Sequence, residues 1–169
     1  MNESQLWSKI NLFQKPKKMW HFCRIESATI RGIPDVNCVI EGKEFWLELK
    51  ANQVKNYGVS NFQINWHLKR QKCGGKVFIL HSCTKQRELK LLRVQNHISS
   101  NHICNHTDNH TRNHTHNHMR NHIHNHIRNH ITSNHILEPR FEILASISFN
   151  QKTIASSISE LFKALLKNL

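Results

Sequence analysis

The segment from Val36 to Lys50 constrains the fold of this chain more than any other part. Val36–Ile40 is rich in β-branched residues, and Glu44–Lys50 carries apolar residues at alternate positions, so each is expected to form a strand. The glycine at position 42, between the two segments, predicts a tight turn. We therefore expect an antiparallel hairpin, which fixes the face on which each side chain lies.

Three charged side chains are expected to meet on this hairpin. Asp35 precedes the first strand, and Glu48 follows thirteen positions later in the second strand. With the turn centred near Gly42, Asp35 is expected opposite Leu49 or Lys50. Because side chains alternate along a strand, Glu48 and Lys50 share one face. The two carboxylates and the ammonium group therefore converge.

This convergence has a chemical use. Two carboxylates on a rigid hairpin can hold Mg²⁺ or Mn²⁺, with water and phosphate oxygens at the remaining positions. A metal held in this way polarises a phosphodiester and lowers the pKa of an attacking water. Lys50 could orient that water or neutralise the developing charge. A Glu-x-Lys pair also occurs by chance on solvated strands, so the Pro-Asp sequence and the hairpin spacing carry the catalytic interpretation.

Hydrophobic patterns outside the hairpin predict a mixed α/β domain with a central sheet flanked by helices. The expected elements are a helix over 3–13, an extended segment over 19–30, a helix over 60–72, and strands over 76–81 and 89–94. In the second helix, Phe62 and Trp66 are four positions apart and are expected to pack inward. Gln63, His67 and Arg70 fall on another face.

Two short motifs resemble the signature of the PD-(D/E)XK nuclease superfamily, namely Pro34-Asp35 and Glu48-Leu49-Lys50. Within it, the chain is most similar to small phage and virus-type endonucleases related to Holliday-junction resolvases and VRR-NUC domains. Gly32-Ile33-Pro34-Asp35 matches their Gly-x-Pro-Asp form. Gln63 lies in the helix after the Glu-x-Lys strand, as the family's accessory glutamine does. The resemblance covers about residues 1–95.

The resemblance implies a restriction-endonuclease-like fold and metal-dependent cleavage of phosphodiester bonds. On this basis Asp35 and Glu48 would bind the metal, Lys50 would assist the nucleophile, and Gln63 would support the site rather than bind metal directly. The resemblance does not imply which DNA structure is cut.

Two glutamates are alternatives for a further acidic residue at the metal site. The family often places such a residue in its first helix, where Glu3 lies one turn before Leu6 and Trp7 and so faces the core. A glutamate in a first turn is also favoured by the helix dipole alone. Glu26 is the other candidate, because related resolvases can supply this acid from a nearby position.

The charge of the chain suits a polyanionic partner. It has 24 Lys+Arg against 11 Asp+Glu, a formal net charge of +13 and a pI near 9.9. Nucleic acid fits such a charge best. Lys15, Lys17 and Lys18, which follow the first helix, and Lys55 and Arg70 are the residues expected to contact DNA.

The sequence also indicates a location for the protein. No stretch approaches the ~20 apolar residues of a membrane span, and the N-terminus has no apolar signal core. We therefore expect an intracellular protein of the cytoplasm, or of the host cytoplasm if the chain is viral, with no membrane partner. The five cysteines lack zinc-type spacing and are expected to be reduced, mostly buried thiols.

Residues 96–135, here the Asn-His tract, differ abruptly from the rest. Asn-His recurs every four residues from Asn101 to His130, and 12 of the 15 histidines lie between His97 and His135. The tract has too little apolar content for a core, so a non-core or disordered insertion is expected. Its strict period resembles expansion of a short DNA repeat. The alternative is transition-metal binding by histidines on one helix face, although asparagine is a poor helix former.

Residues 136–169 again have the pattern of an ordered segment. Residues 140–149 alternate like a strand, and an apolar stripe over 154–165 predicts an amphipathic helix. Ser157 and Glu160 match a capping box. This tail is expected to dock on the core or on a second subunit.

The combined hypothesis is a Mg²⁺- or Mn²⁺-dependent DNA endonuclease. It is expected to be structure-specific, acting on branched DNA or Holliday junctions in viral or phage recombination, repair or genome processing. Cleavage of a two-fold symmetric junction would favour a homodimer. The alternatives are a non-catalytic nucleic-acid-binding module on the same fold, a histidine-rich metal-binding protein, and a restriction-type enzyme, for which the sequence reveals no base readout.

Overall fold

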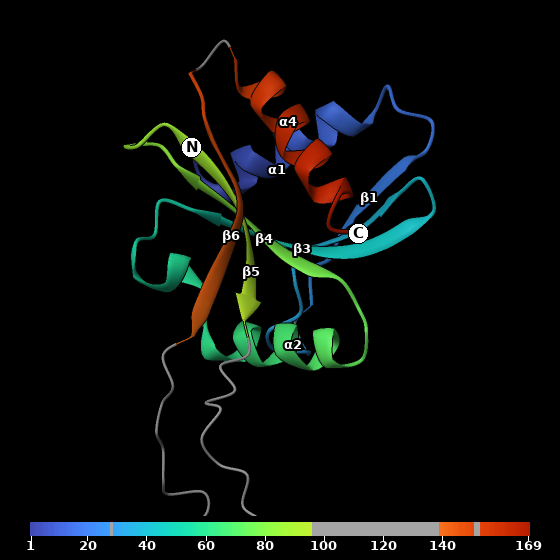
Figure 1. The fold of residues 1–169 in the computed structure, drawn as a ribbon, viewed down its shortest axis with the longest axis vertical. Helices are drawn as coiled ribbons and strands as arrows, with labels where there is room; N and C mark the ends of the chain where they lie inside the picture. Colours follow the sequence, from blue (N-terminus) through green and yellow to red (C-terminus); the bar gives the residue numbers. More distant parts are fainter. Residues whose placement is uncertain (28, 96–138, 151–152) are drawn as a thin grey trace, which may run out of the picture. The chain divides into compact units, whose positions relative to one another are not determined.

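A mixed sheet of six strands forms the centre of the computed structural model, which describes residues 1–27, 29–95, 139–150 and 153–169 (Figure 1). The chain divides into one unit of Met1–Asn96 with Pro139–Leu169 and another of His97–Glu138. The Asn-His tract lies outside the described residues. The described elements are α1 (Glu3–Gln14), β1 (Trp20–Arg24), β2 (Val36–Ile40), β3 (Lys43–Ala51), the 3₁₀ helix η1 (Lys55–Gly58), α2 (Asn61–Lys72), β4 (Val77–Cys83), β5 (Glu88–Gln95), β6 (Arg140–Ser148) and α4 (Ile154–Leu166).

The strands lie in the sheet in the order of the sequence, β1 to β6. All neighbouring pairs are antiparallel except β3 and β4, which are parallel and are connected through α2. All seven residues of β4 are buried, as expected for a central strand covered on both faces. The α/β class and the flanked central sheet are therefore as predicted.

The predicted hairpin is present, but its register differs from the prediction. Ile40 pairs with Lys43, so the turn has only two residues, Glu41 and Gly42, with φ of 51° and 79°. Two positive φ values are typical of a tight hairpin turn. Val36 consequently pairs with Leu47, and the same register places Asp35 level with Glu48 rather than with Leu49 or Lys50.

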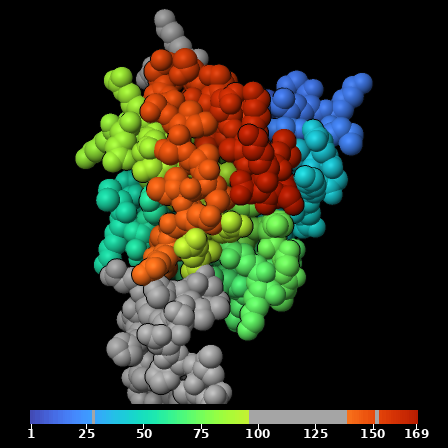
Figure 2. Space-filling view, in the orientation of Figure 1, coloured from blue at the N-terminus to red at the C-terminus, as the bar shows by residue number. Residues whose placement is uncertain are grey.

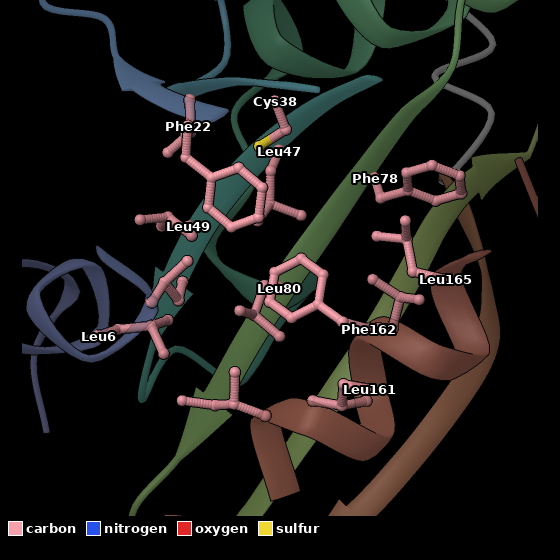
Figure 3. Packing of buried hydrophobic residues seen from close by; sticks show 14 of the residues in the cluster. Leu6, Phe22, Cys38, Leu47, Leu49, Phe78, Leu80, Leu161, Phe162 and Leu165 are labelled. Carbon is pink, nitrogen blue, oxygen red and sulfur yellow. The ribbon is translucent and has the colours of Figure 1, made fainter. Parts of the chain in front are cut away.

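Of the described helices, α1 and α4 cover one face of the sheet and α2 covers the other (Figure 1). α1 and α4 pack against the larger apolar cluster, which includes stacked rings of Phe22 and Phe162 with centroids 5.3 Å apart. Figure 3 shows side chains of both helices packed with those of the sheet, among them Leu6, Leu80 and Phe162. α2 covers the opposite face through a smaller cluster.

The inward face of α2 is not the predicted one. Phe62 is 57 % exposed, whereas Ile64 and His67 are buried. Trp66 is half-buried and contacts Trp46 edge to face. The spacing of Phe62 and Trp66 placed them together on one side of a helix, but it did not fix which side of that helix faces the sheet.

The C-terminal strand and helix form part of the same unit. β6 pairs with β5, and Gln95, the last residue of β5, is opposite Arg140, the first residue of β6. α4 lies alongside β6 (Figure 2). The predicted capping box is wrong: the N-cap is Thr153, and Ser157 lies inside the helix, donating to backbone carbonyls. No helix in the described part is long and apolar enough to cross a membrane.

Four of the five cysteines are described, and all four are free thiols. Cys38 and Cys83 are buried, whereas Cys23 and Cys73 are exposed. The expectation of mostly buried thiols therefore holds for two of these four, and Cys104 lies outside the described residues.

Candidate active site

Asp35 lies at the entrance to β2 and is fixed by the neighbouring strand. Its Oδ2 accepts a hydrogen bond from the backbone N–H of Leu49 at 2.8 Å. The loop before it packs on α2, because a Cβ at Gly32 would lie only 2.4 Å from the carbonyl oxygen of Phe62. The Gly32 φ of +85° is also one that other residues rarely adopt. Glycine in the Gly-x-Pro-Asp motif thus positions the Asp35 carboxylate.

Glu48 is the most unusual side chain of the structure, because it is a fully buried carboxylate. Its Oε1 lies 2.8 Å from Lys50 Nζ and accepts a hydrogen bond from Gln63 Nε2 at 2.5 Å. Its Oε2 is buried and has no hydrogen-bond partner among the described residues. Burial, followed by the charge of nearby Asp35, raises the pKa of Glu48 to about 8, although Lys50 opposes this shift.

Lys50 holds a charge in this setting. Burial lowers the pKa of Lys50, but attraction by Glu48, Glu3 and Asp35 outweighs burial, so this pKa lies above its ordinary value. Nζ is 4.0 Å from Glu3 Oε1, which brings the N-terminus of α1 to the site. The convergence predicted for the hairpin is present in the structure.

The two candidates for the further acidic residue occupy different places. Glu3 contacts Lys50 and is partly exposed. Glu26 is an exposed side chain whose nearest charged partner is the Arg24 guanidinium, at 3.6 Å. The structure therefore brings Glu3, and not Glu26, to the Glu48–Lys50 pair.

Gln63 links the start of α2 to the buried carboxylate. Its Oε1 accepts from the N–H of Ser60 in a capping box, and its Nε2 donates to Glu48. One turn later His67 is fully buried, and in the described part of the chain neither ring nitrogen has a hydrogen-bond partner. Burial and the charge of Lys50 lower the pKa of His67 to about 4, so the ring is neutral at pH 7. Sequence analysis had placed His67 on the same helix face as Gln63, but no spacing had indicated a role for it at the site.

An open cleft of about 820 Å³ leads to Asp35 and Gln63. Its charged lining residues are two arginines, Arg24 and Arg31, which sequence analysis did not select, and two acids, Glu26 and Asp35. The lining residues are Arg24, Ile25, Glu26, Ser27, Ile30, Arg31, Gly32, Ile33, Asp35, Ser60, Phe62 and Gln63.

The cations predicted to contact DNA do not line this cleft. Lys17 lies over the rings of Phe13 and Trp20, and Lys15 and Lys18 are exposed close by in the sequence. Lys55 is exposed in η1. Arg70 lies 3.7 Å from Glu44 and over the ring of Trp46.

No group of three or more His, Cys, Asp or Glu side chains in the described residues could hold a metal ion. Asp35 and Glu48 nevertheless suit a hard divalent cation. Two adjacent carboxylates repel each other, and the Glu48 Oε2 is buried and unpartnered. Mg²⁺ needs only one or two carboxylates when water and phosphate supply its other ligands.

Comparison with known proteins identified no family. No protein-family model matches the chain, and a search of curated proteins found no significant match.

Proposed function

We propose that this chain is a metal-dependent DNA endonuclease of the PD-(D/E)XK type on a restriction-endonuclease-like fold. The observation that carries the proposal is the fully buried Glu48, held between Lys50 and Gln63 beside Asp35. A carboxylate buried with an unpartnered oxygen is unfavourable for stability. Such an arrangement is typical of functional sites.

Each side chain of the site has a role that its contacts support. Asp35 and Glu48 would hold Mg²⁺ or Mn²⁺, which when bound polarises the scissile phosphate and lowers the pKa of a water. Lys50, charged and directed at Glu48, would orient that water or balance charge on the phosphate. Gln63 fixes the rotamer of Glu48 through its amide. Glu3, 4.0 Å from Lys50 Nζ, would help to keep Lys50 in place.

DNA is the proposed substrate. The formal net charge of +13 favours a polyanion, and two guanidinium groups line the cleft that leads to Asp35. We infer cleavage of branched DNA rather than uniform duplex, carried out by a homodimer if the junction is symmetric.

A cleavage panel tests the function directly. The full chain is incubated with four-way junction, flap, single-stranded and duplex DNA in Mg²⁺, Mn²⁺ or EDTA. Asp35→Ala, Glu48→Ala and Lys50→Ala should each lower single-turnover cleavage at least about 100-fold while DNA binding is retained. The matched control is Glu160→Gln, an exposed carboxylate on α4 paired with Lys163, which should cleave normally.

The same panel separates catalysis from binding alone. A non-catalytic module on this fold would bind DNA and give no metal-dependent product. Full metal-dependent cleavage by Asp35→Ala or Glu48→Ala would contradict the active-site assignment.

A further inference from the structure

The cleft carries an aromatic residue that the proposed reaction does not use. Phe62, the second residue of α2, is 57 % exposed and lines the cleft beside Asp35. The guanidinium of Arg31 lies 5.6 Å from the centroid of its ring. A single exposed apolar side chain needs no explanation. The exposed Phe62 ring does need an explanation, because it is paired with the Arg31 cation in the cleft that also contains the candidate catalytic residue Asp35.

Backbone packing fixes this ring relative to the catalytic carboxylates. Gly32 packs directly on the carbonyl of Phe62, so the loop that carries the arginine is held against the first turn of α2. That turn is capped by Ser60 and joined to Glu48 through Gln63. The backbone positions that carry the ring and its cation are therefore held together beside the candidate site.

The chemistry of this surface matches an unpaired nucleobase. Bases stack on aromatic rings and on the planes of guanidinium groups, and both groups are present here. Arg24 adds a second guanidinium to the same cleft, where it lies 3.6 Å from Glu26 and could exchange this ion pair for a flanking phosphate. A base within duplex DNA is already stacked on both sides and exposes only its edges in the grooves. Only a nucleotide out of the stack can reach the ring.

We propose that Phe62 and Arg31 form a stacking platform for one unpaired nucleobase next to the phosphate that is cleaved. The substrate class that follows is DNA with a single-stranded or unpaired nucleotide at the cut site. This inference rests on the proposed nuclease function for the position of that phosphate.

Base stacking is measured without cleavage, using the full chain in EDTA. The probes are 2-aminopurine in a single-stranded oligonucleotide, in a branched DNA with an unpaired nucleotide, and in a fully paired duplex. Phe62→Ala should weaken binding of the two unpaired probes about 5-fold to 150-fold and abolish quenching of their fluorescence. Duplex binding should not change. Phe62→Trp should retain both signals, and the control is Leu12→Ala, an exposed apolar residue of α1 outside the cleft.

The binding and cleavage assays separate the two proposals. Cleavage in Mg²⁺ with no effect of Phe62→Ala on either unpaired probe would overturn the platform and leave the nuclease standing. Stacking lost in Phe62→Ala, in a chain that cleaves nothing, would support the platform and overturn the nuclease. Equal affinity of the unaltered chain for unpaired and paired probes, without quenching, would overturn the platform as well.

Discussion

Replacing Glu48 by glutamine should stabilise the metal-free protein at neutral and alkaline pH. The folded state holds the pKa of this carboxyl at about 8, against an ordinary value of 4.5. The unfolded chain therefore releases the proton near pH 4.5, while the folded chain keeps it until about pH 8. Because the folded state binds the extra proton in this window, stability falls as the pH rises from about 4.5 to 8.

The magnitude follows from the size of the shift. One pKa unit corresponds to about 1.4 kcal/mol, so the displacement from 4.5 to about 8 costs on the order of 5 kcal/mol at alkaline pH. At pH 7 the cost is about 3 kcal/mol. Glu48→Gln cannot ionise and avoids this cost. Titration of Lys50 contributes little to the change in stability between pH 4.5 and 8, because its pKa lies above the ordinary value of 10.5.

Urea unfolding at pH 5, 6, 7 and 8 in EDTA measures the effect. The difference in unfolding free energy between Glu48→Gln and the unaltered chain should grow with pH in favour of the variant. His67 also titrates, but it is present in both proteins, so most of its contribution cancels. Glu160→Gln, at an exposed position, should have the same unfolding free energy as the unaltered chain at each pH.

Magnesium should offset most of this difference in stability at pH 7. Binding requires the ionised carboxylate, and Mg²⁺ at a hundred times its Kd would add about 2.7 kcal/mol to the unaltered chain only. Parallel pH profiles for the two proteins would refute the buried, proton-holding state of Glu48. Equal stabilisation of both by Mg²⁺ would refute its role as a ligand.

Further predictions concern the loop, the first helix and the tail. Gly32→Ala should lower stability by about 2–4 kcal/mol in thermal melts, because its Cβ would meet the Phe62 carbonyl. Gly42 has a similar φ but open space around it, so Gly42→Ala should lower stability less than Gly32→Ala. Equal losses of stability in the two variants would show that the contact with Phe62 is not the cause. Under single-turnover conditions Glu3→Gln should slow cleavage more than Glu26→Gln, since only the former contacts Lys50; the reverse order would reassign the acidic position. A Gly/Ser linker in place of residues 99–133 of the Asn-His tract should leave cleavage and melting temperature nearly unchanged, because loop-closure entropy grows slowly with length. Truncation before β6 should lower the melting temperature, and loss of cleavage in the linker variant would show that the tract has a function.

Local sequence patterns predicted that Asp35, Glu48 and Lys50 lie together on the hairpin. The alternation of side chains along a strand and the turn at Gly42 are sufficient for that prediction. They could not fix the register, since a turn of two residues instead of three moves every pair by one position. The complete burial of Glu48 depends on α2, which crosses over the site from further along the chain.

The residues of the cleft were harder to predict. Arg24 and Arg31 come from the end of β1 and an irregular loop, whose path no periodicity encodes. A surplus of positive charge in the composition indicated an anionic partner, but it could not say which of many cations gather at one place. Phe62 was assigned to the core because aromatic residues at helical spacing usually lie there.

The position of the tail in the core has a genetic consequence. Asp35, Glu48 and Lys50 are all encoded before the repeats, yet Leu161 and Phe162, which complete the core around α1, are encoded after them. The repeat unit is a whole number of codons, so gain or loss of units preserves the reading frame and returns the chain to Arg140 opposite Gln95. A slip of one or two nucleotides in the same repeats would replace β6 and α4, and would thereby remove part of the core from a chain in which Asp35, Glu48 and Lys50 are all intact.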